Sequence, residues 1–595
     1  MRIFSHGLAP LPTLLVQALL LQALLLLAGT TDLARAGTLP AARIEYEIRH
    51  SGQAAPEEGV IQLDCDARGA RVRQLPAGEW IPGAPRETGY QDFAAGRTLQ
   101  LLVDREGRRC HTLAEFAALP ALEATAETAE ILGLPCRKWT ATLYSNRIEL
   151  WSTVAAGLRG GPRLSLLDPD GLVLRILVNG ELEFVAASLE ELPHQTDLWP
   201  ADPGEAVDAA EYRARVTAGW VTTLPVFQRE QVCFNPAAVD TAAMRLALRA
   251  ARAADSSAVL RFAAGTLLLR KLTLPRLAPG QLFAELVERS RGDAYDRTGS
   301  LFLVTEERGG SLLDALERGV GALPRLTTRD GRDYRGLTAT PDYLPPLELV
   351  RFITPFGVGH YNEQVQVKGQ VWADSAVYRL ELSELLPALE GPVWIGAFVG
   401  NYDAGGHELS LTLRHHPGER TVQPEAPGDG WCLPLFNTLN VLEMAGQEYG
   451  RLFEQDTLRV DFELPAGLTD VRLRYTSTGH GGWGGGDEFN PKPNRILLDG
   501  RELATVTPWR SDCAGLRHLN PASGNFWNGV SSSDLSRSGW CPGAAAEPLT
   551  IRLPELAPGP HRLEVAIPQG APEGGSFSAW NVSGTLLGSR PGTRP

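Results

Sequence analysis

Glycine and proline recur along the whole chain at a density that leaves little room for long helices. The 595 residues include 62 Gly and 43 Pro. Between them lie short runs in which apolar and polar side chains alternate, such as 42–48 and 147–151. Alternation with a period of two is typical of strands that bury one face, whereas an amphipathic helix repeats near 3.6. The sequence therefore predicts an all-β protein of many short strands joined by turns.

One segment departs from this pattern, and two breaks divide the rest of the chain. Residues 240–254 are rich in Ala, Leu and Arg, which favour a helix, although a variable insertion is the alternative. Stretches rich in Pro and polar residues or Gly occur at about 190–205 and 416–429 and indicate boundaries. The predicted organisation is a signal peptide at 1–36, a β-rich domain of unknown role at 37–190, a linker at 191–220, and two further β domains at 221–420 and 421–590.

The first 36 residues have the features of a secretory signal peptide. Arg2 precedes the Leu-rich run 14–28, and small residues at the positions that a signal peptidase reads predict cleavage after Ala36. A membrane anchor is the alternative, but the apolar run is short for a span and is interrupted by Gln17 and Gln22. We expect a secreted or periplasmic monomer that is not inserted in a membrane after cleavage.

Charge and cysteine usage narrow the possible partners and cofactors. A formal net charge of −14 opposes nucleic-acid binding, which depends on neutralising phosphates. Export permits disulfides, and Cys541 could close a loop with Cys513, while the odd total of seven Cys leaves at least one without a partner in the chain. We expect no metal and no organic cofactor, because the sequence has neither the ligand spacing of a zinc site nor a phosphate-binding loop.

A Gly-rich loop in the last third of the chain holds the densest set of candidate binding residues. The strand-like run 471–475 leads into a loop that contains His480 and Trp483 and ends in Glu488 beside a phenylalanine. Glycines let a backbone approach a ligand closely. A carboxylate next to an aromatic ring suits a polar, ring-shaped substrate. A flexible surface turn is the alternative, but the concentration of these side chains favours a site.

Three motifs in order resemble the peptide-N-glycosidase F family of peptide-N4-(N-acetyl-β-glucosaminyl)asparagine amidases. They are Arg-Phe-Ile-Thr-Pro at 351–355, the Gly-rich loop that ends in Glu488, and Gly-Trp-Cys-Pro-Gly at 539–543. The charged segment 291–297, which alone would be interpreted as a solvated turn, precedes them in the order that the family has. The resemblance covers about 220–590 and implies two adjacent antiparallel jelly-roll β-sandwiches with the active site between them, preceded here by a small β-rich N-terminal domain.

The resemblance also implies roles for individual residues. Asp296 matches the family's main catalytic aspartate, and Glu488 matches the catalytic glutamate of the C-terminal sandwich. Cys513 and Cys541 match a family disulfide. Aromatic rings among the remaining candidates would stack on sugar faces, and the arginines would fix the substrate and shape the saccharide end of the cleft. The candidates for substrate binding are Arg297, Arg537, Trp540, Tyr402 and Trp483.

The activity that the resemblance implies is hydrolysis of the amide between Asn and the innermost N-acetylglucosamine of N-glycosylated peptides or proteins. The products would be a glycosylamine and an aspartyl peptide. One departure stands out, because Gly400 occupies the position of a further family glutamate, for which Asp403 or Asn401 could substitute. A glycan-binding protein without catalysis is the main alternative, since it would not need both acids. A copper monooxygenase would need clustered His ligands, and the His residues are scattered along the sequence.

Overall fold

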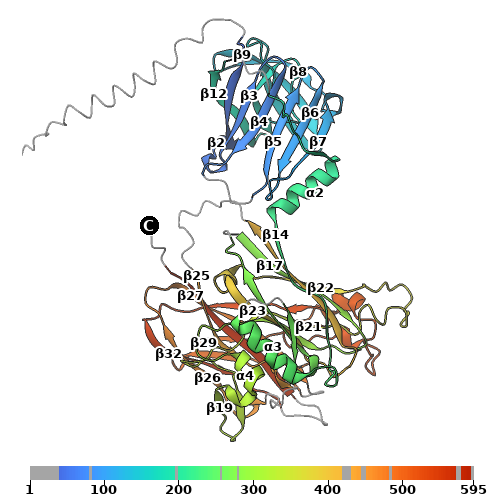
Figure 1. The fold of residues 1–595 in the computed structure, drawn as a ribbon, viewed down its shortest axis with the longest axis vertical. Helices are drawn as coiled ribbons and strands as arrows, with labels where there is room; N and C mark the ends of the chain where they lie inside the picture. The colour runs from blue at the N-terminus through green and yellow to red at the C-terminus, as the bar shows by residue number, and fades with distance from the viewer. Residues whose placement is uncertain are drawn as a thin grey trace, which may run out of the picture. The chain divides into compact units, whose positions relative to one another are not determined.

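The computed structural model describes residues 39–78, 84–193, 198–254, 258–277, 280–417, 430–443, 451–481, 486–570 and 578–590. The chain forms two compact units, and the division between them falls between Trp220 and Val221 (Figure 1). The predicted signal peptide and Trp483 lie outside the described residues. Within the described ranges, no helix combines the length and the apolar character needed to cross a bilayer.

The first unit is built on one open sheet of 13 strands (Figure 1). The strands are β1 (Ala42–His50), β2 (Gln53–Ala54), β3 (Val60–Cys65), β4 (Gly69–Leu75), β5 (Arg86–Asp92), β6 (Arg97–Val103), β7 (Arg109–Glu115), β8 (Glu123–Ile131), β9 (Leu134–Leu143), β10 (Asn146–Thr153), β11 (Leu172–Val178), β12 (Leu182–Glu191) and β13 (Glu205–Ala206). They lie in the order β13-β7-β6-β5-β4-β3-β1-β12-β11-β10-β9-β8, with β2 on β1. Alternate side chains such as Ile44, Tyr46 and Ile48 are buried, as the period of two predicts.

Residues 205–220, expected as part of a linker, supply two elements to the first unit. Strand β13 pairs in parallel with β7. Helix α2 (Ala209–Trp220) follows Asp208, whose carboxylate accepts bonds of 2.8 Å from the backbone N–H groups of Ala210 and Glu211. This is the arrangement of an N-cap. Tyr212 on the helix is buried against Leu102, so the segment packs on the sheet.

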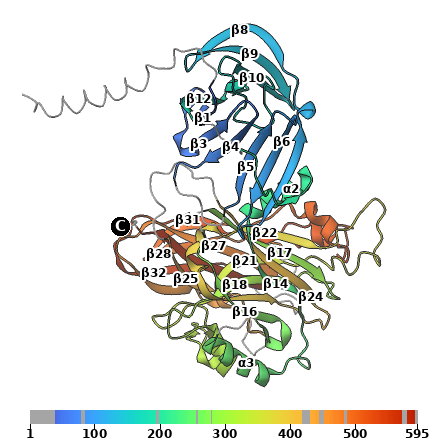
Figure 2. The ribbon, with the colours of Figure 1, turned by 45° about the horizontal axis from the view of Figure 1, so that its top comes forward.

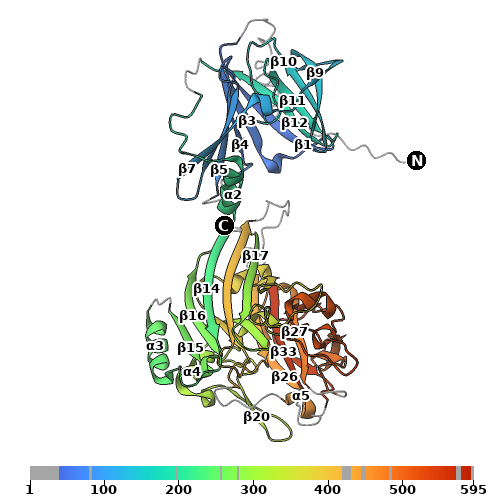
Figure 3. The ribbon, with the colours of Figure 1, turned by 90° about the vertical axis from the view of Figure 1, so that its right-hand side faces the viewer.

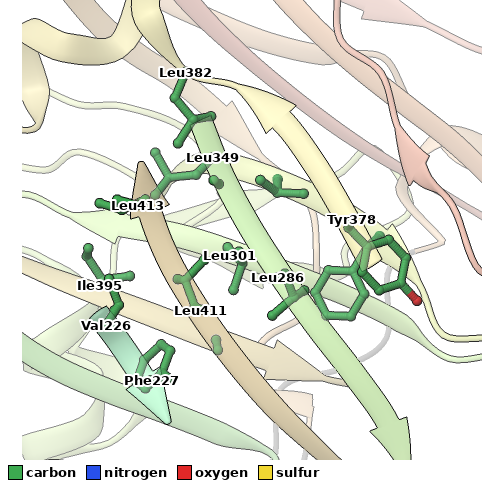
Figure 4. Packing of buried hydrophobic residues seen from close by; sticks show 14 of the residues in the cluster. Val226, Phe227, Leu286, Leu301, Leu349, Tyr378, Leu382, Ile395, Leu411 and Leu413 are labelled. Carbon is green, nitrogen blue, oxygen red and sulfur yellow. The ribbon is translucent and has the colours of Figure 1, made fainter. Parts of the chain in front are cut away.

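The second unit contains two antiparallel β-sandwiches, which confirms the predicted all-β fold with a pair of jelly rolls. The strands of the first sandwich are β14 (Thr222–Val232), β15 (Val259–Phe262), β16 (Leu267–Leu274), β17 (Gly280–Ser290), β18 (Thr298–Val304), β21 (Leu347–Ile353), β22 (Ala376–Glu381), β23 (Gly391–Val399), β24 (His407–Pro417) and β30 (Ala545–Ala546). One sheet has the order β14-β24-β17-β22 and the other β15-β16-β23-β18-β21-β30. Phe227, Leu286 and Leu411 from the first sheet pack with Leu301 and Ile395 from the second (Figure 4).

The second sandwich has two sheets of four strands each. Its strands are β25 (Gly430–Asn437), β26 (Leu458–Leu464), β27 (Thr469–Gly481), β28 (Asn494–Leu498), β29 (Arg501–Val506), β31 (Leu549–Arg552), β32 (Gly559–Ala566) and β33 (Ser578–Ser589). The sheets have the orders β25-β33-β27-β31 and β26-β32-β28-β29. Leu473 and Val582 from one sheet and Val460 and Val565 from the other belong to a common core.

Short helices and one ribbon cover parts of this unit. They are α3 (Thr241–Ala253), α4 (Leu312–Arg318), α5 (Leu452–Gln455) and the pair β19 (Arg325–Thr327) and β20 (Asp333–Arg335). Helix α3, which the composition of 240–254 predicts, begins where the side chain of Asp240 accepts bonds from the N–H groups of Ala242 and Ala243. Its Leu248 is buried in a core shared with β15 and β16, and Figure 2 shows the helix near β16.

Buried arginines and a shared strand pair hold the two sandwiches together. Arg351 on β21 makes a 2.7 Å ion pair with Glu348 and also bonds the Thr478 hydroxyl and the Asn581 carbonyl. Thr478 and Asn581 lie on β27 and β33, which are neighbouring strands in Figure 3. Arg474 on β27 donates bonds of 3.1 and 3.2 Å to carbonyls of β21. Strand β30, which follows most of the second sandwich in sequence, pairs with β21 of the first. The relative position of the sandwiches is therefore fixed by polar contacts that water cannot reach.

Phenylalanine rings lie over glycines of neighbouring strands in the six-stranded sheet. Phe302 is the cross-strand partner of Gly396, and Phe352 is the partner of Gly299. A Cβ atom added to Gly396 would lie 2.3 Å from the Phe302 ring, and one added to Gly299 would lie 2.2 Å from the Phe352 ring. The absence of a side chain on each glycine is thus what makes room for the ring.

Replacing Gly396 by Ala should lower the free energy of unfolding by about 1–3 kcal/mol, since the new methyl group must displace a buried ring. Gly309→Ala is the matched control, because a Cβ there would meet nothing within 4 Å. Urea unfolding of both variants measures the difference. Equal unfolding midpoints would contradict the packing described.

Candidate active site

The two predicted catalytic acids come from different sandwiches and meet at one place. Asp296 lies in the connection between β17 and β18, and Glu488 lies in the segment that follows β27. Both side chains line the same two cavities. They are 19% and 20% exposed, so they face the cavities while most of their surface is covered.

Arg537 lies behind the acids and contacts both of them. Its Nε donates to Glu488 Oε1 at 3.1 Å, and its Nη2 lies 3.7 Å from Asp296 Oδ2. Further bonds to the Leu535 carbonyl and the Ser532 hydroxyl hold the guanidinium in place. The side chain is fully buried. The resemblance implies that Arg537 helps to shape the saccharide end of the cleft; in the structure its guanidinium contacts both acids.

The environment of the two acids favours retention of a proton. Burial, and next the negative charge of Asp296, raise the pKa of Glu488 to about 7, although Arg537 acts in the opposite direction. Burial also raises the pKa of Asp296 against the effect of Arg537. Two adjacent buried carboxyls cannot both ionise freely. The pair can therefore hold one proton near neutral pH and can supply a base and an acid together.

Arg297 is oriented by a chain of buried charges. It makes a bidentate contact with Asp293, at 2.7 and 3.2 Å. Asp293 Oδ2 lies 3.6 Å from His407 Nε2, and His407 Nδ1 lies 2.8 Å from Glu288 Oε1. Although burial would lower the pKa of His407, its two carboxylate neighbours raise it to about 9. Burial would likewise raise the pKa of Asp293, but His407 and Arg297 lower it to about 2. At neutral pH Asp293 and His407 are therefore ionised and hold Arg297 at the cleft, whereas burial raises the pKa of Glu288 at the far end of the chain.

The first cavity at the acid pair has a volume of about 210 Å³, and most of the residues that line it are polar. Its Tyr402 is 55% exposed, and the hydroxyl of that residue donates to Glu443 at 2.9 Å. Trp540 also lines it but is only 3% exposed, because His480 stacks on its ring and its Nε1 bonds the Gly479 carbonyl. The ring of Tyr402 is thus the more available one for a sugar face. The polar lining residues are Asp296, Arg297, Thr298, Tyr402, Asn440, Glu443, His480, Glu488 and Asn581.

Position 400, where the resemblance implies a further glutamate in the family, lies at the wall of this cavity. Gly400 lines it, whereas the side chains of Asn401 and Asp403 bond nearby backbone groups. Glu443 reaches the same cavity from the segment after β25, and burial raises its pKa. Sequence reasoning missed Glu443, because no motif marks it and it lies far along the chain from Gly400.

The second cavity has a volume of about 550 Å³ and also ends at the acid pair. Its walls carry five aromatic side chains: Tyr295, Phe356, Phe489, Phe526 and Trp527. Sequence reasoning did not single out Phe526 and Trp527. A signal was present, since two adjacent aromatic residues precede Asn-Gly, a pair typical of tight turns.

A disulfide ties together the segments behind the acids. Cys513 and Cys541 are joined, as the resemblance implies, and Cys541 follows Trp540 directly. Cys65, Cys110, Cys136, Cys233 and Cys432 are free. In the described part of the chain, no three His, Cys, Asp or Glu side chains are grouped so that they could hold a metal ion.

Comparison with known families places this arrangement in a defined class. Residues 223–415 match the model described as "Peptide-N-glycosidase F, N terminal", and residues 448–587 match "Peptide-N-glycosidase F, C terminal". Residues 114–214 match "N-glycanase peptide, N-terminal domain". The chain belongs to the peptide-N-glycosidase F family.

Solved structures of one relative resemble nearly the whole chain. PNGF-II in two crystal forms, with space groups P21 and C2, is 38% identical to this chain, and the alignments cover 92% and 93% of this chain and 99% of PNGF-II. The TM-scores are 0.79 and 0.74. No protein with a curated description matches significantly.

Replacing His407 by Gln should destabilise the protein by about 3–5 kcal/mol near neutral pH, because it removes the buried cation that contacts Asp293 and Glu288. The pKa of His407 is higher in the folded state, about 9, than the usual 6.5. Its contribution is therefore complete below about pH 6.5 and is lost as the pH rises through 9. Chemical unfolding at several pH values should show a difference from wild type that shrinks on the alkaline side.

The matched control for this experiment is His518→Gln, since His518 is exposed. It should leave the free energy of unfolding nearly unchanged at every pH. A difference between wild type and His407→Gln that stays constant with pH would show that the imidazole is not charged in the folded protein.

Proposed function

We propose that the protein is a peptide-N4-(N-acetyl-β-glucosaminyl)asparagine amidase, which cleaves the amide between asparagine and the innermost N-acetylglucosamine of N-glycans. The observation that carries the proposal is the pair Asp296 and Glu488, held on Arg537 at the end of a polar cavity. A protein that only bound glycans would have no need of two buried carboxyls whose pKa values are raised towards neutrality. Family membership supports N-glycanase chemistry in general.

The proposed reaction is a hydrolysis in which the acid pair moves protons. The ionised carboxylate accepts a proton from water as the water oxygen bonds to the amide carbon of the side chain. The other carboxyl donates its proton to the nitrogen as the carbon–nitrogen bond breaks. The products are an aspartyl peptide and a glycosylamine. Asp296 has the primary role at the scissile amide, and Glu488 acts with the water and the proximal sugar.

Arg537 contributes electrostatically. It keeps its charge throughout and lies against both carboxyls, so it stabilises whichever of them is ionised. Because it is fully buried and held by the Leu535 carbonyl and the Ser532 hydroxyl, no reorganisation is needed when the proton moves.

The substrate in this proposal is an N-glycosylated peptide or protein, with its first sugar in the polar cavity. Tyr402 offers a ring face, and Arg297 and Glu443 offer a donor and an acceptor for sugar hydroxyl and amide groups. Orientation by the buried chain through Asp293 prepares Arg297 for this contact.

The sequence supports export to an oxidising compartment. The first 36 residues have the pattern of a secretory signal peptide, and the Cys513–Cys541 disulfide fits a secreted or periplasmic location. The protein would act there as a monomer.

Wild-type protein incubated with a denatured N-glycoprotein should release the glycans and convert each modified Asn to Asp, as read by peptide mass. Asp296→Asn should lower kcat by about 10²–10⁴-fold, the usual contribution of a general acid or base. Glycan binding and the unfolding midpoint should stay close to those of the wild type.

Glu363→Gln, which alters an exposed carboxylate outside both cavities, is the control and should keep full turnover. Absence of release from every class of N-glycan would refute the amidase. Full turnover by Asp296→Asn would remove that residue from the mechanism while leaving the activity in place.

A further inference from the structure

The second cavity begins at the same acid pair as the first but has different walls. Asp296, Gly481 and Glu488 line both cavities. Beyond these shared residues, the walls of the second cavity come from Tyr295, Phe356, Phe489, Ser532 and the segment 524–527, none of which carries a charged side chain. Its volume of about 550 Å³ lies within the range usual for ligand pockets.

The bond that the proposed function breaks joins a sugar to a peptide. In the bound substrate, the sugar and the peptide must therefore extend from the acid pair in different directions. The polar cavity, which contains Arg297, Asn440 and Glu443, suits the hydroxyl groups of the sugar. We propose that the second cavity binds the peptide around the glycosylated Asn, in extended form, with an aromatic or large apolar side chain next to that Asn. This inference rests on the proposed function.

The turn that carries Trp527 is built to present a ring. The Gly529 N–H donates to the Phe526 carbonyl at 2.8 Å, and the Phe526 N–H donates to the Val530 carbonyl at 2.8 Å. Gly529 has a φ of +80°, which glycine adopts without strain. Trp527 nevertheless is 97% exposed.

An indole ring held in water on an ordered turn contributes nothing to the core. On binding, such a ring would bury a large area at a small cost in conformational entropy. Phe526, next to it, packs edge to face against Phe489 at 6.0 Å. The two residues thus connect an exposed ring at the rim to aromatic walls that reach the acid pair.

Charge restricts which peptides fit. The charged groups of the cavity are the two carboxyls at its inner end. An Asp or Glu side chain close to the modified Asn would add a like charge to a pair whose pKa values are already raised. Peptides with an apolar or aromatic neighbour should therefore bind best, and an acidic neighbour should weaken binding.

The test measures binding by calorimetry in the Asp296→Asn background, so that no turnover interferes. The ligands are a short N-glycopeptide with Phe next to the modified Asn, the same glycopeptide with Asp in place of Phe, and free di-N-acetylchitobiose. Adding Trp527→Ala should weaken binding of the Phe glycopeptide about tenfold, a loss of one buried aromatic contact. Binding of the free sugar should change less than about twofold.

Tyr144→Ala is the control, because Tyr144 is an exposed aromatic residue of the first unit, 92% exposed. It should leave all three affinities unchanged. Equal affinities of the Phe and Asp glycopeptides, or no effect of Trp527→Ala on either, would overturn the peptide site. An equal loss for free chitobiose would show that the aromatic walls bind sugar instead.

A separate measurement distinguishes failure of the proposed function. Wild-type protein that leaves the mass of the Phe glycopeptide unchanged would refute the amidase, even where Trp527 contributes to binding of that peptide. Turnover that is unaffected by Trp527→Ala at low substrate concentration would refute the peptide site and leave the amidase standing.

Discussion

The active site depends on the buried polar contacts that fix one sandwich against the other. Asp296 belongs to the first sandwich and Glu488 to the second, so their separation is set by the join between β21, β27 and β33. In that join Arg351 and Arg474 are buried and bond groups across it. Removing one member would leave a buried charge without compensation, which usually destabilises a protein strongly. The network therefore gives the two sandwiches a defined position that apolar packing alone would specify less sharply.

The surroundings of the acid pair make ionisation of its two carboxyls unfavourable. Raised pKa values mean that burial of these carboxyls opposes folding at high pH, where both would lose their protons. Arg537 offsets part of this effect and is itself held by the Leu535 carbonyl and the Ser532 hydroxyl. Asp293, by contrast, is buried behind Arg297, has a lowered pKa and stays ionised, so carboxyls close together in sequence are suited to different tasks.

Local patterns in the sequence predicted the strands, the helix capped by Asp240 and, through the resemblance, the pair of sandwiches and the disulfide. These features depend on periodicity, capping and short motifs. The presence of Glu443 and Gly400 in one cavity, the burial of Arg537 and the aromatic cavity of Trp527 depend on segments distant in sequence that meet only in the fold. Residues 205–220 show that a local pattern can also mislead. The Pro-containing stretch before them led to the prediction of a linker, whereas a strand and a helix form there.

The proposed mechanism requires that the acid pair keep a proton near neutral pH, and burial beside Asp296 raises the pKa of Glu488 to about 7. Carbon-13 NMR of protein labelled at the Glu carboxyl carbons tests it directly, with Glu488→Gln used to identify the resonance. One signal, absent from the variant, should titrate with a pKa of about 7. Ionisation of that carboxyl near the ordinary pKa of about 4.3 would contradict this mechanism, because the two carboxyls would then not share a proton as a pair.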